Sequence, residues 1–225
     1  MKKLGENDMR TYFKAVRPDG TDFRTGTIDY AAALGGEPIT LPEVAEPECC
    51  TKDVLHASTV PAETLIGGSW PCRLFEVGGT PVAESGYKRG FFSLTVVREV
   101  DAYQALGPQG EQIAVLIDRA GKLTAGEAEK LVAAEGAAGD AAWDAAWEAA
   151  WEAAWRAVRD AGRRAVEEAA WEATRSAAWY AARDAALALV VRDLISKEHY
   201  DLLTGPWVQV IGPAHPDDPT REDTP

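Results

Sequence analysis

The chain has 225 residues, 36 acidic and 23 basic, and a formal charge of −13 at neutral pH. This charge argues against direct binding to nucleic acid or to anionic membranes, because both need clustered lysine and arginine. The sequence has no apolar stretch of about 18 residues, and Met1-Lys2-Lys3 runs into polar residues rather than a hydrophobic signal core. We therefore expect no membrane association and a cytoplasmic location.

Residues 1–103 have the pattern of a small β-rich domain. Short runs of β-branched and aromatic residues are separated by turn residues such as the pairs Gly35-Gly36 and Gly67-Gly68. The predicted strands are residues 11–16, 21–24, 72–77 and 91–97. The first two are expected to form a hairpin, and a helix is expected near residues 61–66.

Residues 104–136 are predicted to form a short helical connector. Its first helix covers residues 111–120. The second begins after Thr124, whose hydroxyl can cap the helix while Glu127, three residues later, reaches back to the Thr124 backbone. This pattern is a capping box.

Residues 137–195 contain a four-residue repeat in which two alanines precede a large residue and a charged one. Alanine has the highest helix propensity, and no proline lies between Pro108 and Pro206. The repeat therefore predicts one long α-helix, with Gly162 as the expected position of any bend or hairpin.

The remaining residues are predicted to form a short helical cap over 196–211 and a disordered, acidic, proline-rich tail over 212–225. Gly205 and Pro206 are expected to stop the last helix. The predicted fold class is thus α+β: a small N-terminal β-rich domain, a long Ala/Trp tetrad-repeat helix and a short C-terminal helical cap.

Several segments resemble a family of uncharacterised proteins from actinobacteria and their phages. They are Arg24-Thr25-Gly26, His56-Ala57-Ser58, Trp70-Pro71-Cys72-Arg73-Leu74, Lys88-Arg89, Leu94-Thr95-Val96-Val97-Arg98-Glu99, Leu106-Gly107-Pro108-Gln109-Gly110-Glu111, the tetrad array, Val191-Arg192-Asp193-Leu194-Ile195-Ser196, Glu198-His199-Tyr200 and Leu203-Thr204-Gly205-Pro206-Trp207. The resemblance implies a small β domain, a repeat helix of variable length and a helical end cap. It implies no catalytic residue.

The large residues of the repeat are the candidate interaction residues, because a row of exposed indoles is an apolar patch that needs a partner. They are Trp143, Trp147, Trp151, Trp155, Trp171 and Trp179, with Arg159 and Arg163 at the same register. Three interpretations stay open: filling of gaps between helices, a recognition surface, and neutral expansion of a repeated DNA unit. The predicted function is a non-enzymatic assembly module that forms a homo-oligomer and acts on a host protein.

The first alternative is a nucleotide-like small-molecule-binding or degenerate enzyme domain in residues 10–101, with Arg24, His56 and Ser58 near a pocket. His56-Ala57-Ser58 is similar to the His-x-Ser segment of ADP-ribosyltransferase-like domains, where the histidine holds a nicotinamide dinucleotide. A structural histidine beside a turn is the competing interpretation. The second alternative is an acidic mimic of DNA, although the repeat mixes acids with arginines.

Metal and catalytic motifs are not expected. Cys49, Cys50, His56 and Cys72 are potential zinc ligands, but adjacent cysteines chelate one metal awkwardly and structural sites usually space their ligands by two to four residues. We found no Ser-His-Asp order, glycine-rich phosphate loop or paired helical histidines. The sequence therefore predicts no metal, no cofactor and no catalytic residue.

Overall fold

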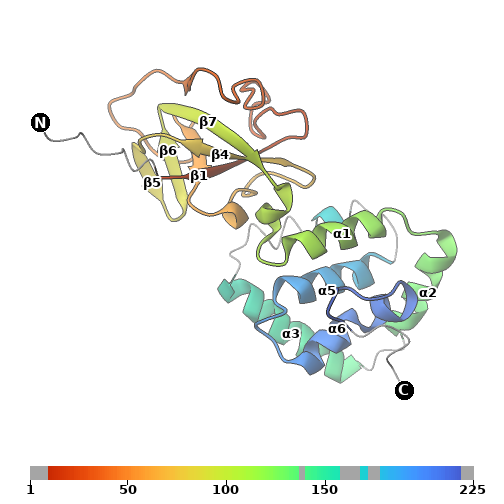
Figure 1. The fold of residues 1–225 in the computed structure, drawn as a ribbon. Helices are drawn as coiled ribbons and strands as arrows, with labels where there is room; N and C mark the ends of the chain where they lie inside the picture. The colour runs from red at the N-terminus through yellow and green to blue at the C-terminus, as the bar shows by residue number, and fades with distance from the viewer. Residues whose placement is uncertain (1–9, 137–139, 158–167, 172–177, 219–225) are drawn as a thin grey trace, which may run out of the picture. The chain divides into compact units, whose positions relative to one another are not determined.

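A computed structural model describes residues 10–136, 140–157, 168–171 and 178–218. The chain divides into two compact units, Met1–Ala102 and Tyr103–Pro225. The first unit contains the strands and the second contains the α-helices, as Figure 1 shows for each unit. We call them the β unit and the helical unit.

The β unit is built around a seven-stranded sheet with the order β2-β7-β4-β1-β3-β6-β5. All neighbouring strands in this order are antiparallel. The strands are β1 (Tyr12–Val16), β2 (Ile39–Thr40), β3 (Leu55–Ser58), β4 (Arg73–Gly78), β5 (Ala83–Ser85), β6 (Lys88–Phe91) and β7 (Ser93–Val100). A 3₁₀ helix, η1 (Pro61–Glu63), follows β3, and another, η2 (Ala102–Leu106), follows β7.

The core of the β unit is an apolar cluster contributed by five strands and one loop. Its buried members are Tyr12, Val16, Tyr30, Leu55, Ala57, Phe75, Val77, Phe91, Leu94 and Val96. In β7, Leu94 and Val96 are fully buried while Val97 is 53% exposed, as the two-residue period of a strand requires. Burial of these side chains is the main favourable contribution to the folding of the unit.

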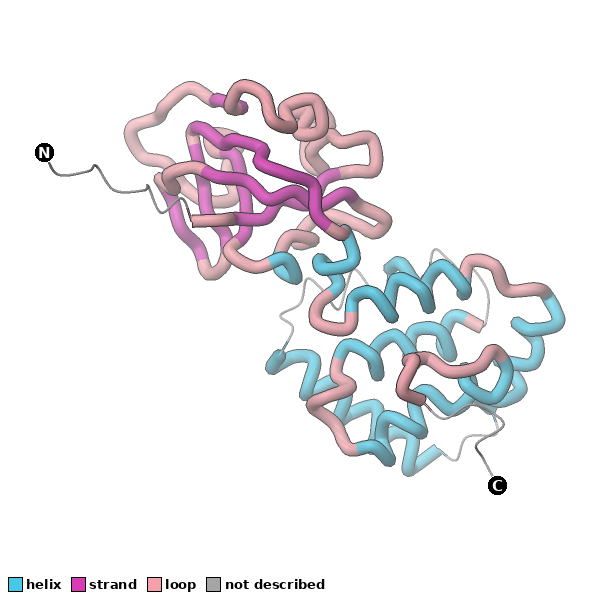
Figure 2. The backbone as a smooth tube through the Cα atoms, viewed as in Figure 1, coloured by secondary structure: helices cyan, strands magenta, loops and turns pink. Residues whose placement is uncertain are grey.

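The predicted hairpin of residues 11–16 with 21–24 is wrong. β1 pairs with β3 and β4 instead, and a long connection made mostly of loop and turn leads from β1 to β3 (Figure 2). Asp22 explains the difference, because its buried carboxylate accepts hydrogen bonds from the backbone N–H groups of Thr25 (2.7 Å), Thr27 (3.1 Å) and Ile28 (3.0 Å). These bonds close a compact loop where a second strand was expected.

The helical unit consists of short α-helices. Their described members are α1 (Gly110–Ala120), α2 (Ala125–Gly136), α3 (Asp140–Ala157), α5 (Trp179–Val190) and α6 (Lys197–Val210). The capping box predicted before α2 is confirmed. The Thr124 backbone N–H donates to Oε2 of Glu127 at 2.8 Å, and the Glu127 N–H donates to Oγ1 of Thr124 at 3.2 Å.

The prediction of one long Ala/Trp repeat helix is wrong. Within the described residues the longest helix is α3, with 18 residues, and the repeat is divided among α3, residues 168–171 and α5. Helices α3 and α5 pack against each other and against α6. A single rod would leave its alanine faces in water, whereas packing of short helices removes Ala146, Ala150, Ala182 and Ala185 from solvent completely. Gly162 lies outside the described residues. The fold is therefore mixed α/β, with an antiparallel sheet and short helices.

The C-terminal part is more ordered than its composition predicts. Gly205 and Pro206 lie inside α6, where the buried side chains of Leu203 and Trp207 hold the helix although Pro206 has no N–H to donate. Residues 212–218, expected to be disordered, follow α6 as a loop that buries Ala214 and His215. Residues 219–225 lie outside the described part of the chain.

Candidate functional site

A cavity of about 300 Å³ in the β unit is lined by the three residues predicted to lie near a pocket, Arg24, His56 and Ser58. Lys14, Cys50 and Lys88 also line it, and the side chains of Phe13 and Phe23 belong to its wall. We call it the basic cavity. The lining comes from the three adjacent strands β1, β3 and β6, from the loop between β1 and β3, and from residues 63–68, which follow β3.

The pairing of the strands explains how residues distant in sequence meet here. Ser58 on β3 stands opposite Phe13 on β1 and opposite Lys88 on β6. Because side chains alternate along a strand, His56 and Ser58 share one side of β3 while Leu55 and Ala57 enter the core. The polar side of β3 thus faces the basic cavity.

The loop of residues 22–28, which the hydrogen bonds to Asp22 close, supplies Phe23 and Arg24 to the basic cavity. Burial opposes ionisation of Asp22, but the hydrogen bonds from Thr25, Ile28 and Thr27 outweigh it and lower its pKa to about 2. Asp22 therefore stays charged at neutral pH and holds the loop closed. Arg24 lies two residues after Asp22, and its Nη1 donates a hydrogen bond of 3.4 Å to the carbonyl oxygen of Cys50.

Cys50 and His56 are joined at the edge of the basic cavity. The backbone N–H of Cys50 donates a 2.8 Å hydrogen bond to Nε2 of His56. The imidazole is therefore the tautomer with its proton on Nδ1. Burial, followed by the charges of Lys14, Lys88 and Arg24, lowers the pKa of His56 to about 4, so this ring is neutral at physiological pH.

Three cationic side chains dominate the electrostatics of the basic cavity. Lys14 is half-buried, and burial lowers its pKa to about 8, against a smaller opposing effect of Asp22. Within the described residues, none of Lys14, Arg24 and Lys88 has a carboxylate within 4.0 Å. Glu63 is the acidic residue of the lining and is 7% exposed. The lining thus carries more positive than negative charge.

Sequence reasoning missed Lys14, Cys50 and Lys88 as lining residues. One local signal for Lys14 existed, since it interrupts the apolar run of β1 between buried Tyr12 and buried Ala15. For Lys88 and Cys50 the sequence carries no comparable signal, because their approach to His56 depends on strand pairing and on the path of a long loop.

The predicted interaction tryptophans contact one another in the helical unit. Trp147 stacks on Trp151 with ring centroids 5.0 Å apart, and Trp171 meets Trp179 edge to face at 5.4 Å. Trp143, Trp147, Trp151 and Trp179 are partly buried, whereas Trp171 is 51% exposed. The side chain of Trp155 and the whole of Arg159 and Arg163 lie outside the described part of the chain.

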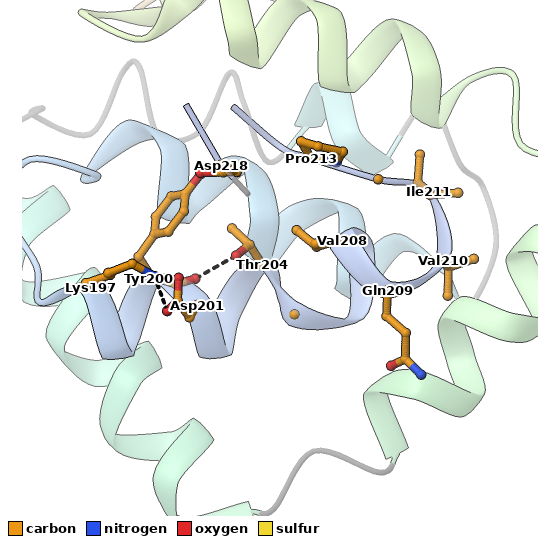
Figure 3. Close-up of a pocket in the computed structure, with 12 residues that line it drawn as sticks. Lys197, Tyr200, Asp201, Thr204, Val208, Gln209, Val210, Ile211, Pro213 and Asp218 are labelled. Carbon is orange, nitrogen blue, oxygen red and sulfur yellow. Dashed lines mark hydrogen bonds and ion pairs between the residues drawn. The ribbon is translucent and has the colours of Figure 1, made fainter. Parts of the chain in front are cut away.

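A second cavity, of about 650 Å³, lies between α6 and residues 211–218 (Figure 3). Five of its six polar side chains are already paired with one another or with the backbone. The Tyr200 hydroxyl donates to Asp218 at 3.0 Å, Nζ of Lys197 lies 2.5 Å from Oδ2 of Asp201, and Oγ1 of Thr204 donates to the Tyr200 carbonyl at 2.8 Å. Its remaining lining is largely aliphatic, and it contains none of the predicted site residues. It therefore offers less than the basic cavity for recognising a charged ligand.

The thiols and acids do not form a metal centre in the described residues, where no group of three or more His, Cys, Asp or Glu side chains has a suitable arrangement. Cys49, Cys50 and Cys72 are free thiols. No helix in the described ranges is both long enough and apolar enough to cross a membrane.

Comparison with known proteins gave no match to a family model, a curated protein or a solved structure. The resemblance to actinobacterial and phage proteins therefore stays a prediction.

Proposed function

We propose that the β unit binds an anionic small molecule in the basic cavity. The observation that carries the proposal is the gathering of Lys14, Arg24 and Lys88 around a neutral histidine, with no carboxylate partner in the described residues. In a chain with a formal charge of −13, such a cluster is a local exception. Burial disfavours the Lys14 ammonium and lowers its pKa to about 8, and a bound anion would offset this effect.

The ligand class that fits best is a phosphate ester of nucleotide size. A volume of about 300 Å³ lies at the small end of the range for ligand sites. The two lysines and Arg24 suit a phosphate group, and Phe13 and Phe23 offer aromatic surface to a base. The proposal includes no chemical step and concerns binding alone.

Isothermal titration with adenosine monophosphate, adenosine and inorganic phosphate tests this proposal. We expect the monophosphate to bind at least tenfold more tightly than adenosine, and its binding to weaken as salt increases. Lys88→Met should weaken binding by about tenfold or more, since it removes a charge from a site partly shielded from water.

Lys122→Met is the matched control, because it also removes one charge but at an exposed lysine that lies two residues after α1 and pairs with Asp118. It should leave the dissociation constant unchanged. Equal affinity for adenosine and adenosine monophosphate, or equal affinity in the Lys88→Met variant and the parent protein, would overturn the proposal.

Self-association through the tryptophan repeat, action on a host protein and mimicry of DNA stay predictions from the sequence. The first of them depended on a continuous helix with exposed indoles, and no contact among the described residues favours any of the three over the basic cavity.

A further inference from the structure

Cys50 combines several features that occur together at no other described residue. Its φ is +69°, which makes it the one non-glycine residue of the described chain in the left-handed region. Its N–H is held by His56, its carbonyl by Arg24, and Nζ of Lys88 donates to its Sγ at 3.9 Å. Cys50 is exposed and lines the basic cavity.

The backbone of Cys50 is held in a conformation that costs about 1 kcal/mol or more for a residue with a side chain. Two hydrogen bonds, from the Cys50 N–H to His56 and from Arg24 to the Cys50 carbonyl, fix this conformation from both sides. Strained backbone fixed in this way is concentrated at functional sites. In this conformation Sγ of Cys50 lies 3.9 Å from Nζ of Lys88.

The nucleophilic form of cysteine is the thiolate. Nζ of Lys88 lies 3.9 Å from Sγ, and Arg24 and Lys14 belong to the same lining, so these charges attract a negatively charged reagent to the sulfur. His56 does not serve as the base, because its Nε2 already accepts the Cys50 N–H. His56 is a positioning residue.

We propose that Cys50 is a nucleophile that reacts with negatively charged small-molecule disulfides drawn into the basic cavity. The Cys50 thiolate attacks one sulfur of the disulfide, a new sulfur–sulfur bond forms, the original one breaks, and the other half leaves as a thiolate. The thiol proton passes to solvent before the attack. Cys50 is oxidised in this step, and the small-molecule disulfide is the oxidant that is reduced. The inference rests on the proposed anion site, which supplies the preference for negative charge.

The other two thiols are placed differently. Cys49 is partly buried, and its Sγ lies 4.0 Å from the carbonyl oxygen of Lys88 rather than beside an ammonium group. Burial and then the neighbouring Cys50 raise its pKa. Cys72 is buried, and burial raises its pKa to about 12. Both should react slowly, which makes Cys49→Ser a matched control for Cys50→Ser one residue away.

The test compares two disulfides in the full chain at pH 7: 5,5′-dithiobis(2-nitrobenzoate), which carries two negative charges, and neutral 2,2′-dithiodipyridine. Each rate is divided by that of a short unfolded cysteine peptide, so that intrinsic reactivity cancels. We expect the normalised rate to be at least tenfold higher for the dianion, and peptide mapping by mass spectrometry to place the first modification on Cys50.

Lys88→Met should lower the dianion rate by about tenfold and change the neutral rate less, whereas Cys49→Ser should change neither. First modification at Cys49 or Cys72, or equal normalised rates for the two disulfides, would overturn the inference. Titration of the Cys50→Ser protein with adenosine monophosphate separates the two proposals. Binding there together with an unreactive Cys50 in the parent refutes this inference alone, while a selectively reactive Cys50 without monophosphate binding refutes only the nucleotide-sized ligand.

Discussion

Nη2 of Arg183 lies 2.6 Å from Oδ1 of its neighbour Asp184, and both side chains are largely buried on α5. The Arg183 guanidinium also lies over the rings of Trp179 (4.9 Å), Tyr180 (5.1 Å) and Trp147 (5.5 Å). Two tryptophans of the repeat therefore contact a cation inside the helical unit. These contacts give the tryptophans a structural role that needs no second chain.

The Arg183 contacts predict a large loss of stability in the Arg183→Met variant. This change removes the Arg183 guanidinium from the Asp184 carboxylate, which is 2% exposed. We expect the free energy of unfolding to fall by about 3 kcal/mol, as measured by urea denaturation followed at 222 nm. Arg192→Met is the control, since Arg192 pairs at 3.5 Å with an exposed Asp217, and it should cost less than about 1 kcal/mol. Equal losses in the two variants would contradict the prediction.

Lys14→Met should stabilise the β unit while it weakens binding of adenosine monophosphate. Burial lowers the pKa of Lys14 to about 8, so the ammonium is less stable in the folded chain than in the unfolded one. At pH 7 we expect the free energy of unfolding of the β unit, measured by hydrogen exchange of its peptides, to rise by about 1 to 2 kcal/mol. The dissociation constant for adenosine monophosphate should increase. Lys52→Met, at an exposed lysine outside the basic cavity, should change neither. A Lys14→Met protein that is less stable than the parent would contradict the claim that burial of the Lys14 ammonium lowers stability.

His56 should make the β unit sensitive to acid between about pH 6.5 and pH 4. Its folded pKa of about 4 is below the value of 6.5 expected in the unfolded chain, because burial and the charges of Lys14, Lys88 and Arg24 disfavour its protonation. Between these two values the unfolded state binds the additional proton, so stability is complete above pH 6.5 and falls as the pH is lowered toward 4.

In His56→Gln, the amide oxygen can still accept the Cys50 N–H but does not titrate. Hydrogen exchange of β-unit peptides at a series of pH values should therefore show a flatter dependence in this window than in the parent protein. His199→Gln, which changes a partly exposed histidine of α6 in the helical unit, should leave the profile of the β-unit peptides as it is. Parallel profiles for His56→Gln and the parent would show that His56 is not held neutral in the folded chain at pH values between 4 and 6.5.

Asp22→Asn should open the loop that carries Phe23 and Arg24. The change puts an amide where three backbone N–H groups now meet a carboxylate, and we expect a loss of about 2 kcal/mol. The amides of Thr25, Thr27 and Ile28 should exchange with solvent at least about tenfold faster. In the parent protein the Asp22 contribution is complete above pH 3.8 and is lost as the pH falls toward its folded pKa of about 2. Glu37→Gln, at an exposed acid of the same unit, is the control.

The strands that could be predicted from sequence are those whose side chains are mostly apolar and enter the core. β1 and β4 have apolar side chains that enter the core, and residues 11–16 and 72–77 locate them to within one residue. β3 and β6 were missed, because His56, Ser58 and Lys88 replace apolar residues on the sides that line the basic cavity. The polar residues that line the candidate site thus interrupt the apolar pattern from which β3 and β6 could have been predicted.

The repeat misled prediction for a different reason. The alanine-rich tetrads predict that these residues are helical, and the repeat residues in α3 and α5 are indeed helical. Helix propensity is local, however, and does not say where a chain stops and folds back on itself. That depends on the tertiary burial of alanines such as Ala150 and Ala182, which only the packed unit reveals. For the site, Arg24, His56 and Ser58 were found from sequence, whereas Lys14, Lys88 and Cys50 needed the strand register and the path of the loop.

The central position of β1 has a consequence for how the two units fold. β1 is the first strand of the sheet in sequence order but pairs with β4, so that Lys14 stands opposite Phe75, 61 positions later. The sheet therefore closes a long loop before its middle strands are paired, whereas the helical turns and the Thr124 capping box form between near neighbours. Stopped-flow refolding should accordingly show helical signal before the sheet is complete, and β1 should be the last part of the β unit to become protected from solvent exchange.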